Sequence, residues 1–192
     1  MNELDVVQRV IAERRSVFPP AFADRRVGDD LIEQMLVSAN WAPTHKLTEP
    51  WRFYVVRDEA LLRLADFMAQ QYRADPKGGQ FVQKKYDSIK AKVARSSAVI
   101  LICMQRDSQE RVPEWEEQAA VAMAVQNMWL CGWSLGVGGY WSTPPYRKAV
   151  SDFIELAAGE ECLGFFYLGH FDKSGQAPKR TSWQEKAQWI RS

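Results

Sequence analysis

Histidine and cysteine are scarce in this chain. Its 192 residues include only two His and three Cys, and Cys103, Cys131 and Cys162 form no C-x-x-C pair. Zinc sites and disulfide frameworks need such residues at close spacings, so the sequence predicts neither a metal site nor a disulfide framework. Free thiols are typical of a reducing compartment, and we therefore expect a cytoplasmic protein.

Net charge and long apolar runs are also lacking. The 25 Lys and Arg residues nearly cancel the 24 Asp and Glu residues, which leaves a formal net charge of +1. A protein that binds nucleic acid through its overall charge has a larger basic surplus, so nucleic acid is not an expected partner. The most apolar stretch, residues 119–135, is shorter than the roughly 20 residues of a membrane span. We expect it to form a buried helix without membrane contact, and the N-terminal segment lacks the apolar core of a signal peptide.

The common catalytic signatures are absent as well. The chain has no G-x-S-x-G, no P-loop, no H-E-x-x-H, and no G-x-G-x-x-G between a strand and a helix. With no metal site and no nucleophile motif, difficult chemistry would have to come from an organic cofactor.

What the chain does contain is the composition of a folded domain. Apolar residues make up 46% of it and aromatic residues 12%, which excludes a disordered chain. The length predicts a single domain over residues 1–192. Helices are predicted at residues 3–13, 29–42, 58–71, 80–95, 113–135, 146–158 and 182–190. Strands are predicted at residues 51–56, 98–104, 136–141 and 162–170, with the second buried on both faces. Loops are predicted at residues 74–79 and 171–180. This order of elements is typical of one α+β domain.

Four segments have residue types suited to a cofactor. Arg14-Arg15-Ser16 follows the first helix and offers bidentate donors for a phosphate, although Arg is also common at a solvated helix end. Residues 42–51 (APTHKLTEPW) form a polar loop that either lines a site or simply connects a helix to a strand. The glycines of residues 136–143 allow close approach of a flat ligand or make a tight turn. Lys179-Arg180 would complete a phosphate site or belong to a solvated tail.

Taken in order, these segments resemble the flavin-dependent nitroreductase family. The resemblance also includes Gln126-Asn127 on the long helix and the G-F-F-Y-L-G strand at residues 164–169. It implies an α+β fold with a mostly antiparallel central sheet surrounded by helices. It further implies an intertwined homodimer, with FMN at each of two subunit interfaces. The implied activity is that of an NAD(P)H oxidoreductase, in which hydride passes by a ping-pong reaction to nitroaromatics, quinones or related small acceptors.

The resemblance implies specific contacts to FMN. The residues concerned are Arg14, Arg15, Ser16, Pro43, Thr44, His45, Lys46, Trp141, Ser142, Thr143, Lys179 and Arg180. The first three would hold the phosphate and the pyrimidine side of the flavin, and Lys179 or Arg180 would close on the phosphate. The residues of the Gly-rich segment would run along the ring, and residues 43–46 would reach across from the other subunit. No side chain is predicted to be catalytic by itself, because the flavin carries the hydride; His45 and Lys46 are candidate contributors.

Two departures from the family pattern leave alternatives open. Glu49 stands where a Gln is usual, and Ser142 stands where an Arg is common. A non-catalytic flavin-binding protein, such as a redox sensor or flavin store, is one alternative. A specialised flavin enzyme such as a reductive dehalogenase is another. Residues 77–95 contain six Lys or Arg and one Asp, which suits either a flap that attracts anionic substrates or NADPH, or a solvated helix face.

Overall fold

Four antiparallel strands form the centre of the molecule. The computed structural model describes residues 2–75, 79–173 and 179–191. The strands are β1 (Trp51–Val56), β2 (Ala98–Gln105), β3 (Val137–Ser142) and β4 (Glu160–His170), in the sheet order β1-β2-β4-β3. A bulge interrupts the register of β2 and β4 between Ile102 and Cys103. The predicted α+β fold and antiparallel sheet are confirmed.

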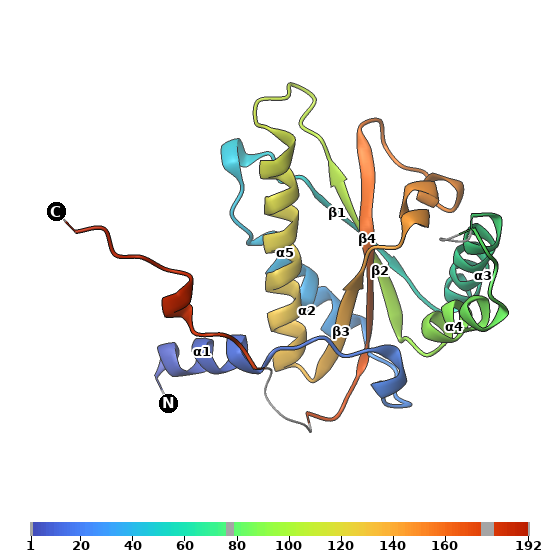
Figure 1. Cartoon of the computed structure of the whole chain (residues 1–192), viewed down its shortest axis with the longest axis horizontal. Helices are drawn as coiled ribbons and strands as arrows, with labels where there is room; N and C mark the ends of the chain where they lie inside the picture. The colour runs from blue at the N-terminus through green and yellow to red at the C-terminus, as the bar shows by residue number, and fades with distance from the viewer. Residues whose placement is uncertain (1, 76–78, 174–178, 192) are drawn as a thin grey trace.

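Helices cover both faces of this sheet (Figure 1). On one face lie α2 (Asp29–Asn40) and the long α5 (Glu114–Ser134), which pack against each other. On the other lie α3 (Glu59–Ala74) and α4 (Gln83–Ala94). Short 3₁₀ segments η1 (Pro19–Ala21), η2 (His45–Leu47), η3 (Pro145–Asp152) and η4 (Trp183–Glu185) lie in the connections.

Strand β2 joins two hydrophobic cores. Ile100 and Ile102 pack in the core with α2 and α5, whereas Val99 and Leu101 pack in the core with α3 and α4. Successive side chains of a strand point to opposite faces, so a continuous apolar run supplies both cores. The prediction that this strand is buried on both faces is therefore confirmed.

Two predicted helices are wrong. Residues 146–158 form only the 3₁₀ segment η3, which starts after Pro144 and ends at Asp152. Residues 182–190 form only the single turn η4, whose residues are all exposed. A short amphipathic helix needs a surface against which to bury its apolar side, and the described residues of the tail, 179–191, are all exposed. Residues 76–78 and 174–178 of the two predicted loops lie outside the described residues.

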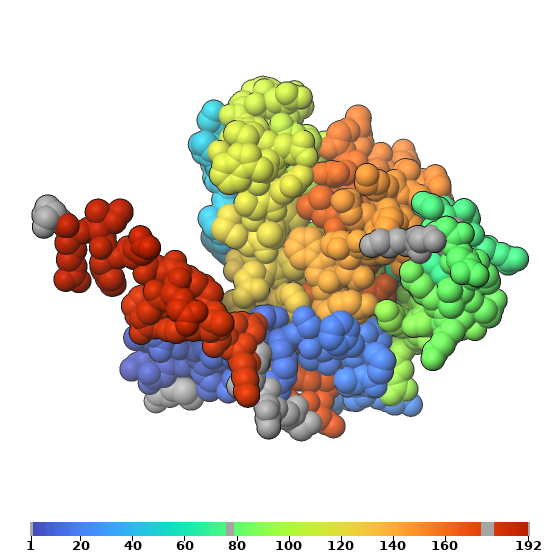
Figure 2. Space-filling view, in the orientation of Figure 1, coloured from blue at the N-terminus to red at the C-terminus, as the bar shows by residue number. Residues whose placement is uncertain are grey.

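Apolar side chains remain exposed along one side of the molecule. Helix α1 (Glu3–Glu13) begins with an Asn2 capping box and has no fully buried residue. Its Leu4, Val7 and Ile11 are exposed, and Val10 is partly buried against the core. The C-terminal segment extends away from the body (Figures 1 and 2) and leaves Ile190 97% exposed. Large exposed apolar groups of this kind are typical of surfaces that associate.

Candidate functional site

Two arginines lie over two tryptophans at the C-terminal end of α5. The guanidinium carbon of Arg14 is 4.4 Å from the ring centroid of Trp129, and that of Arg15 is 5.2 Å from the ring centroid of Trp133. Trp129 and Trp133 are four residues apart and therefore share one face of the helix. Cations at these distances are attracted to the faces of aromatic rings, so the two rings support the Arg14-Arg15-Ser16 segment from below.

Two nitrogens of the Arg14 guanidinium have no hydrogen-bond partner. Its Nε and Nη1 atoms are buried and unbonded. Burial lowers the pKa of Arg14 below its ordinary value, and the nearby positive charge of Arg180 lowers it further. A buried donor without a partner costs about 1–3 kcal/mol, more when it is charged. The unused Arg14 donors and the nearby charge of Arg180 therefore form a place that an anion would stabilise.

Arg14 and Arg15, together with the nearby Arg180, are called the cationic cluster, or Arg14 cluster, below. Strand β3 lies beside its first two residues. The Val17 amide donates to the Gly139 carbonyl at 3.0 Å, which fixes residues 14–17 along the strand edge. A Cβ on Gly138 would come within 2.8 Å of the Val17 Cβ, so the close approach requires glycine. Trp141 opposes Phe166 across the sheet, and Phe166 makes an edge contact with Trp129 at 5.2 Å.

The predicted residues of this region thus converge in part. Arg14, Arg15 and Ser16 lie at one edge, with Trp141 connected to them through Phe166 and Trp129. Ser142 ends β3 half-buried, and Thr143 follows it exposed. Arg180 lies close enough to lower the pKa of Arg14, and Lys179 beside it is exposed.

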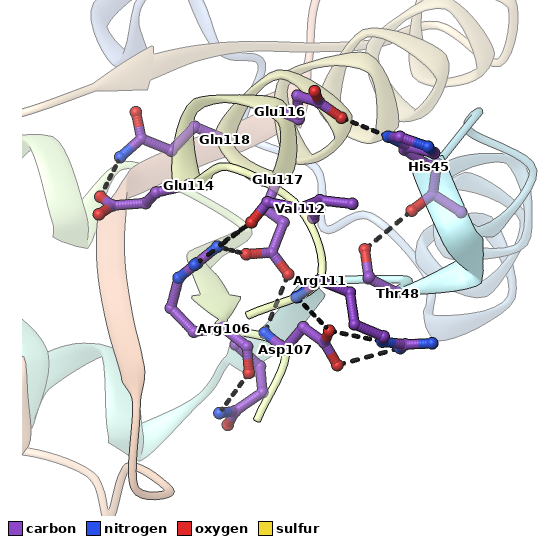
Figure 3. Close-up of polar contacts among 12 residues, drawn as sticks. His45, Thr48, Arg106, Asp107, Arg111, Val112, Glu114, Glu116, Glu117 and Gln118 are labelled. Carbon is purple, nitrogen blue, oxygen red and sulfur yellow. Dashed lines mark hydrogen bonds and ion pairs between the residues drawn. The ribbon is translucent and has the colours of Figure 1, made fainter. Parts of the chain in front are cut away.

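The His45 loop lies at the opposite end of α5. His45 Nδ1 is 2.6 Å from Glu116 Oε2 (Figure 3), and Lys46 Nζ donates to the Arg111 carbonyl at 2.8 Å. Glu116 is in the first turn of α5 and Trp129 is 13 positions later, which is about 20 Å at 1.5 Å per residue. Within one chain, the loop and the Arg14 cluster are therefore held apart.

The backbone of this loop is strained. Lys46, Leu47 and Glu49 have φ angles of 52°, 53° and 42°, in the left-handed region that side chains other than glycine rarely adopt. The Thr44 hydroxyl accepts from the Glu49 amide at 3.2 Å and holds the turn. Such strain costs about 1 kcal/mol or more per residue and gathers at functional sites.

A buried polar network supports the same end of α5. Glu117 is 1% exposed, pairs with Arg106, and accepts from the Asp107 amide at 2.9 Å. Asp107 in turn accepts from Arg111 Nε at 2.7 Å and from Nη2 at 3.0 Å (Figure 3). The hydrogen bonds from Arg111 lower the pKa of Asp107 to about 2. This network fixes the segment before α5, to which Lys46 is bonded.

The comparisons with known proteins agree with this architecture. A profile of the Nitroreductase family matches residues 11–170. The chain belongs to the nitroreductase family. A Bacillus subtilis protein named "Putative NAD(P)H nitroreductase YfhC" is 29% identical over 185 residues, which cover 94% of this chain and 92% of that protein.

Two solved structures extend the agreement. The structure of a nitroreductase-like family protein from Bacillus cereus is 29% identical, with a TM-score of 0.83 over 97% of this chain and 96% of that one. A structure from Desulfovibrio desulfuricans, solved in complex with FMN, has a TM-score of 0.71 over 100% of this chain and 98% of that one. It is 23% identical to this chain, so this likeness concerns the fold alone. The predicted family, the nitroreductase-like fold and the oxidoreductase class are confirmed.

Several contacts of this nitroreductase were not predicted from its sequence. The two ring partners Trp129 and Trp133 were missed, although their spacing of four on the long helix is a visible signal. Glu116 was missed because it meets His45 across 71 positions. Within the described ranges, no three His, Cys, Asp or Glu side chains could hold a metal ion. None of the helices described is long and apolar enough to cross a membrane.

Proposed function

We propose that this chain is an FMN-dependent NAD(P)H oxidoreductase that reduces small acceptors such as nitroaromatics and quinones. The observation that carries the proposal is the half-buried Arg14, whose buried Nε and Nη1 have no partner and which lies close to Arg180. The phosphate of FMN is a dianion with strong acceptor oxygens, and its ring is flat and aromatic. It therefore suits a cationic cluster beside a glycine-lined strand.

The residues have distinct roles in this proposal. When bound, FMN supplies hydride transfer between the nicotinamide and the acceptor. Arg14, Arg15 and Arg180 hold negative charge, and the tryptophan rings below keep the first two in place. Trp141, Ser142 and Thr143 line the ring side. Because hydride transfer needs no side-chain nucleophile, no residue has to form a covalent bond with the substrate.

A homodimer is part of the proposal. The His45–Lys46 loop lies about 20 Å along α5 from the Arg14 cluster, so only a second copy would bring the two together. Large apolar side chains that a partner would cover are exposed on α1, on the end of α2 and on the tail: Leu4, Val7, Ile11, Trp41, Trp189 and Ile190. An isologous interface would place each loop against the other chain's cationic cluster.

An absorption spectrum tests the cofactor assignment. Protein mixed with FMN and then desalted is expected to keep the visible flavin bands, and the double variant R14A/R15A is expected to lose them. The matched control is R9A on α1, because Arg9 is exposed and its ion pair, at 3.7 Å, is with Glu13 of the same helix. Stoichiometric FMN in R14A/R15A would contradict the phosphate assignment.

Reduction separates an enzyme from a flavin store. Anaerobic NADPH or NADH is expected to bleach the flavin bands, and a quinone is expected to restore them. Bound FMN that neither nucleotide reduces would reject the enzyme and favour a redox sensor or flavin store.

A further inference from the structure

A cavity lies on the far side of the sheet from α5. It has a volume of about 580 Å³ and is enclosed by α3, α4 and η3. Lys85 and Lys92 come from α4, Lys148 comes from η3, and the end of β3 contributes Ser142. Lys85 and Lys92 are seven positions apart, so they lie on one face of the helix.

The cavity is electropositive. Asp75 is the one acidic residue among the described residues that line it, against three lysines. Neither Lys92 nor Lys148 has an ion-pair partner in the described part of the chain, although Lys90 on the same helix pairs with Asp66 at 2.6 Å. Uncompensated ammonium groups around a concave surface focus the field that attracts an anion.

The floor of the cavity is aromatic and apolar. Tyr72 and Ile89 are buried beneath it, and Lys85 Nζ lies 4.6 Å from the centroid of the Tyr72 ring. An apolar floor with a few charged groups at its rim suits a flat aromatic ligand that bears phosphate. Ser142 lines this cavity and is also a residue that the proposed function places along the flavin ring.

We propose that this cavity binds the phosphate-bearing adenosine end of NADPH and makes the enzyme prefer NADPH to NADH. The inference rests on the proposed function, because Ser142 connects the cavity to the flavin only if FMN binds where we place it. NADPH carries a 2′-phosphate dianion where NADH has a hydroxyl group, so attraction of that phosphate by Lys92 and Lys148 would favour NADPH. The lysine-rich segment then serves as a determinant of specificity.

Equilibrium binding tests the proposal without turnover. FMN-loaded protein is titrated calorimetrically with adenosine 2′,5′-bisphosphate and with 5′-AMP. The bisphosphate is expected to bind roughly tenfold more tightly, and K92A/K148A is expected to remove that difference. The matched control K90A changes a lysine of the same helix that is already paired outside the cavity lining, so it should keep the difference. Equal affinities in the unaltered protein, or an equal loss in K90A, would overturn the proposal.

Kinetics supply the second readout. In K92A/K148A, kcat/KM for NADPH is expected to fall roughly tenfold while kcat/KM for NADH stays unchanged. If the variant instead loses kcat/KM for 4-nitrobenzoate but not for nitrobenzene, and keeps NADPH, the cavity serves an acidic acceptor and the proposal is wrong. If neither nucleotide reduces bound FMN in the unaltered protein, the proposed function itself fails, whereas equal use of both nucleotides refutes only the specificity.

Discussion

The two ends of α5 are held in opposite ways. At its N-terminal end, polar groups are paired: Glu116 with His45, Glu117 with Arg106, and Asp107 with Arg111. At its C-terminal end, Arg14 and Arg15 rest on tryptophan rings, and Arg14 has buried donors without partners. Paired polar groups fix the local structure, whereas the unpartnered donors of Arg14 favour an incoming anion. The difference indicates that the N-terminal end of α5, called the support below, holds the structure. The C-terminal end, called the binding surface, is suited to an anion.

The largest effect is expected from removing the buried carboxylate of the support. In E117A, Arg106 would keep its charge in a mostly buried position without its partner. Breaking a buried pair in this way typically costs about 3 kcal/mol or more, so the free energy of unfolding should fall by about that amount. Urea unfolding measures it, with E114Q as the control because Glu114 is exposed. A loss below about 1 kcal/mol would mean that Glu117 does not hold this end of the helix.

The binding surface should respond in affinity rather than in stability. Charged hydrogen bonds contribute about 1.5–3 kcal/mol, so R14A is expected to weaken FMN binding roughly tenfold to a hundredfold. Its unfolding free energy should fall by at most about 1 kcal/mol, the size of the contact with the Trp129 ring, because Arg14 Nε and Nη1 have no protein partner to lose. Quenching of FMN fluorescence measures the affinity. R14K keeps the charge but loses the planar guanidinium, so its FMN affinity should lie between those of the unaltered protein and R14A. An R14A protein that is strongly destabilised would make Arg14 a structural residue instead.

Acid should weaken the support. Hydrogen bonds from Arg111 hold the pKa of Asp107 at about 2, below its ordinary value of 3.8. A carboxyl with a lowered pKa in the folded state stabilises it above the ordinary pKa, and that contribution disappears as the pH falls towards 2. Unfolding monitored between pH 4 and pH 2 should therefore be less steep in D107N than in the unaltered protein. Identical acid profiles would show that the Asp107–Arg111 pair does not act on folding.

The smallest effect is expected at the exposed pair of the His45 loop. His45 is more than half exposed, so E116Q should reduce the unfolding free energy by only about 0.5 kcal/mol, and salt should reduce the difference further. Thermal unfolding at low and high salt measures this change. A larger, salt-independent loss would place Glu116 within the structural network of Glu117 and would weaken the comparison between the two ends.

Local patterns predicted most elements of the fold. The strand at residues 51–56 and the first helix at residues 3–13 have the predicted bounds, because an aromatic and β-branched run and a 3.6-residue stripe are each contained in one segment. The helix predicted at residues 146–158 was wrong because neighbouring residues outside the apolar pattern changed the local structure. Their apolar residues suit a helix, but Pro144 and Pro145 start a 3₁₀ turn that ends at Asp152.

The site was less predictable than the fold. Motif order predicted Arg14 and His45 as candidates, because each is surrounded by recognisable neighbours. It did not locate Trp129 under Arg14, or Glu116 beside His45, because those contacts join residues about 70 to 115 positions apart. Such pairings depend on how α5 packs, and no local spacing encodes them.

The exposed apolar side chains of α1 have a consequence for how the protein would bind FMN. An 11-residue helix with no buried side chain is marginal in water, and the chain runs directly from it into Arg14. In the proposed homodimer, a partner that covers α1 would also steady the cation that holds the flavin. Assembly and cofactor binding would then be thermodynamically linked, each strengthening the other by the same factor. Dilution would release FMN, and adding FMN would drive subunits together.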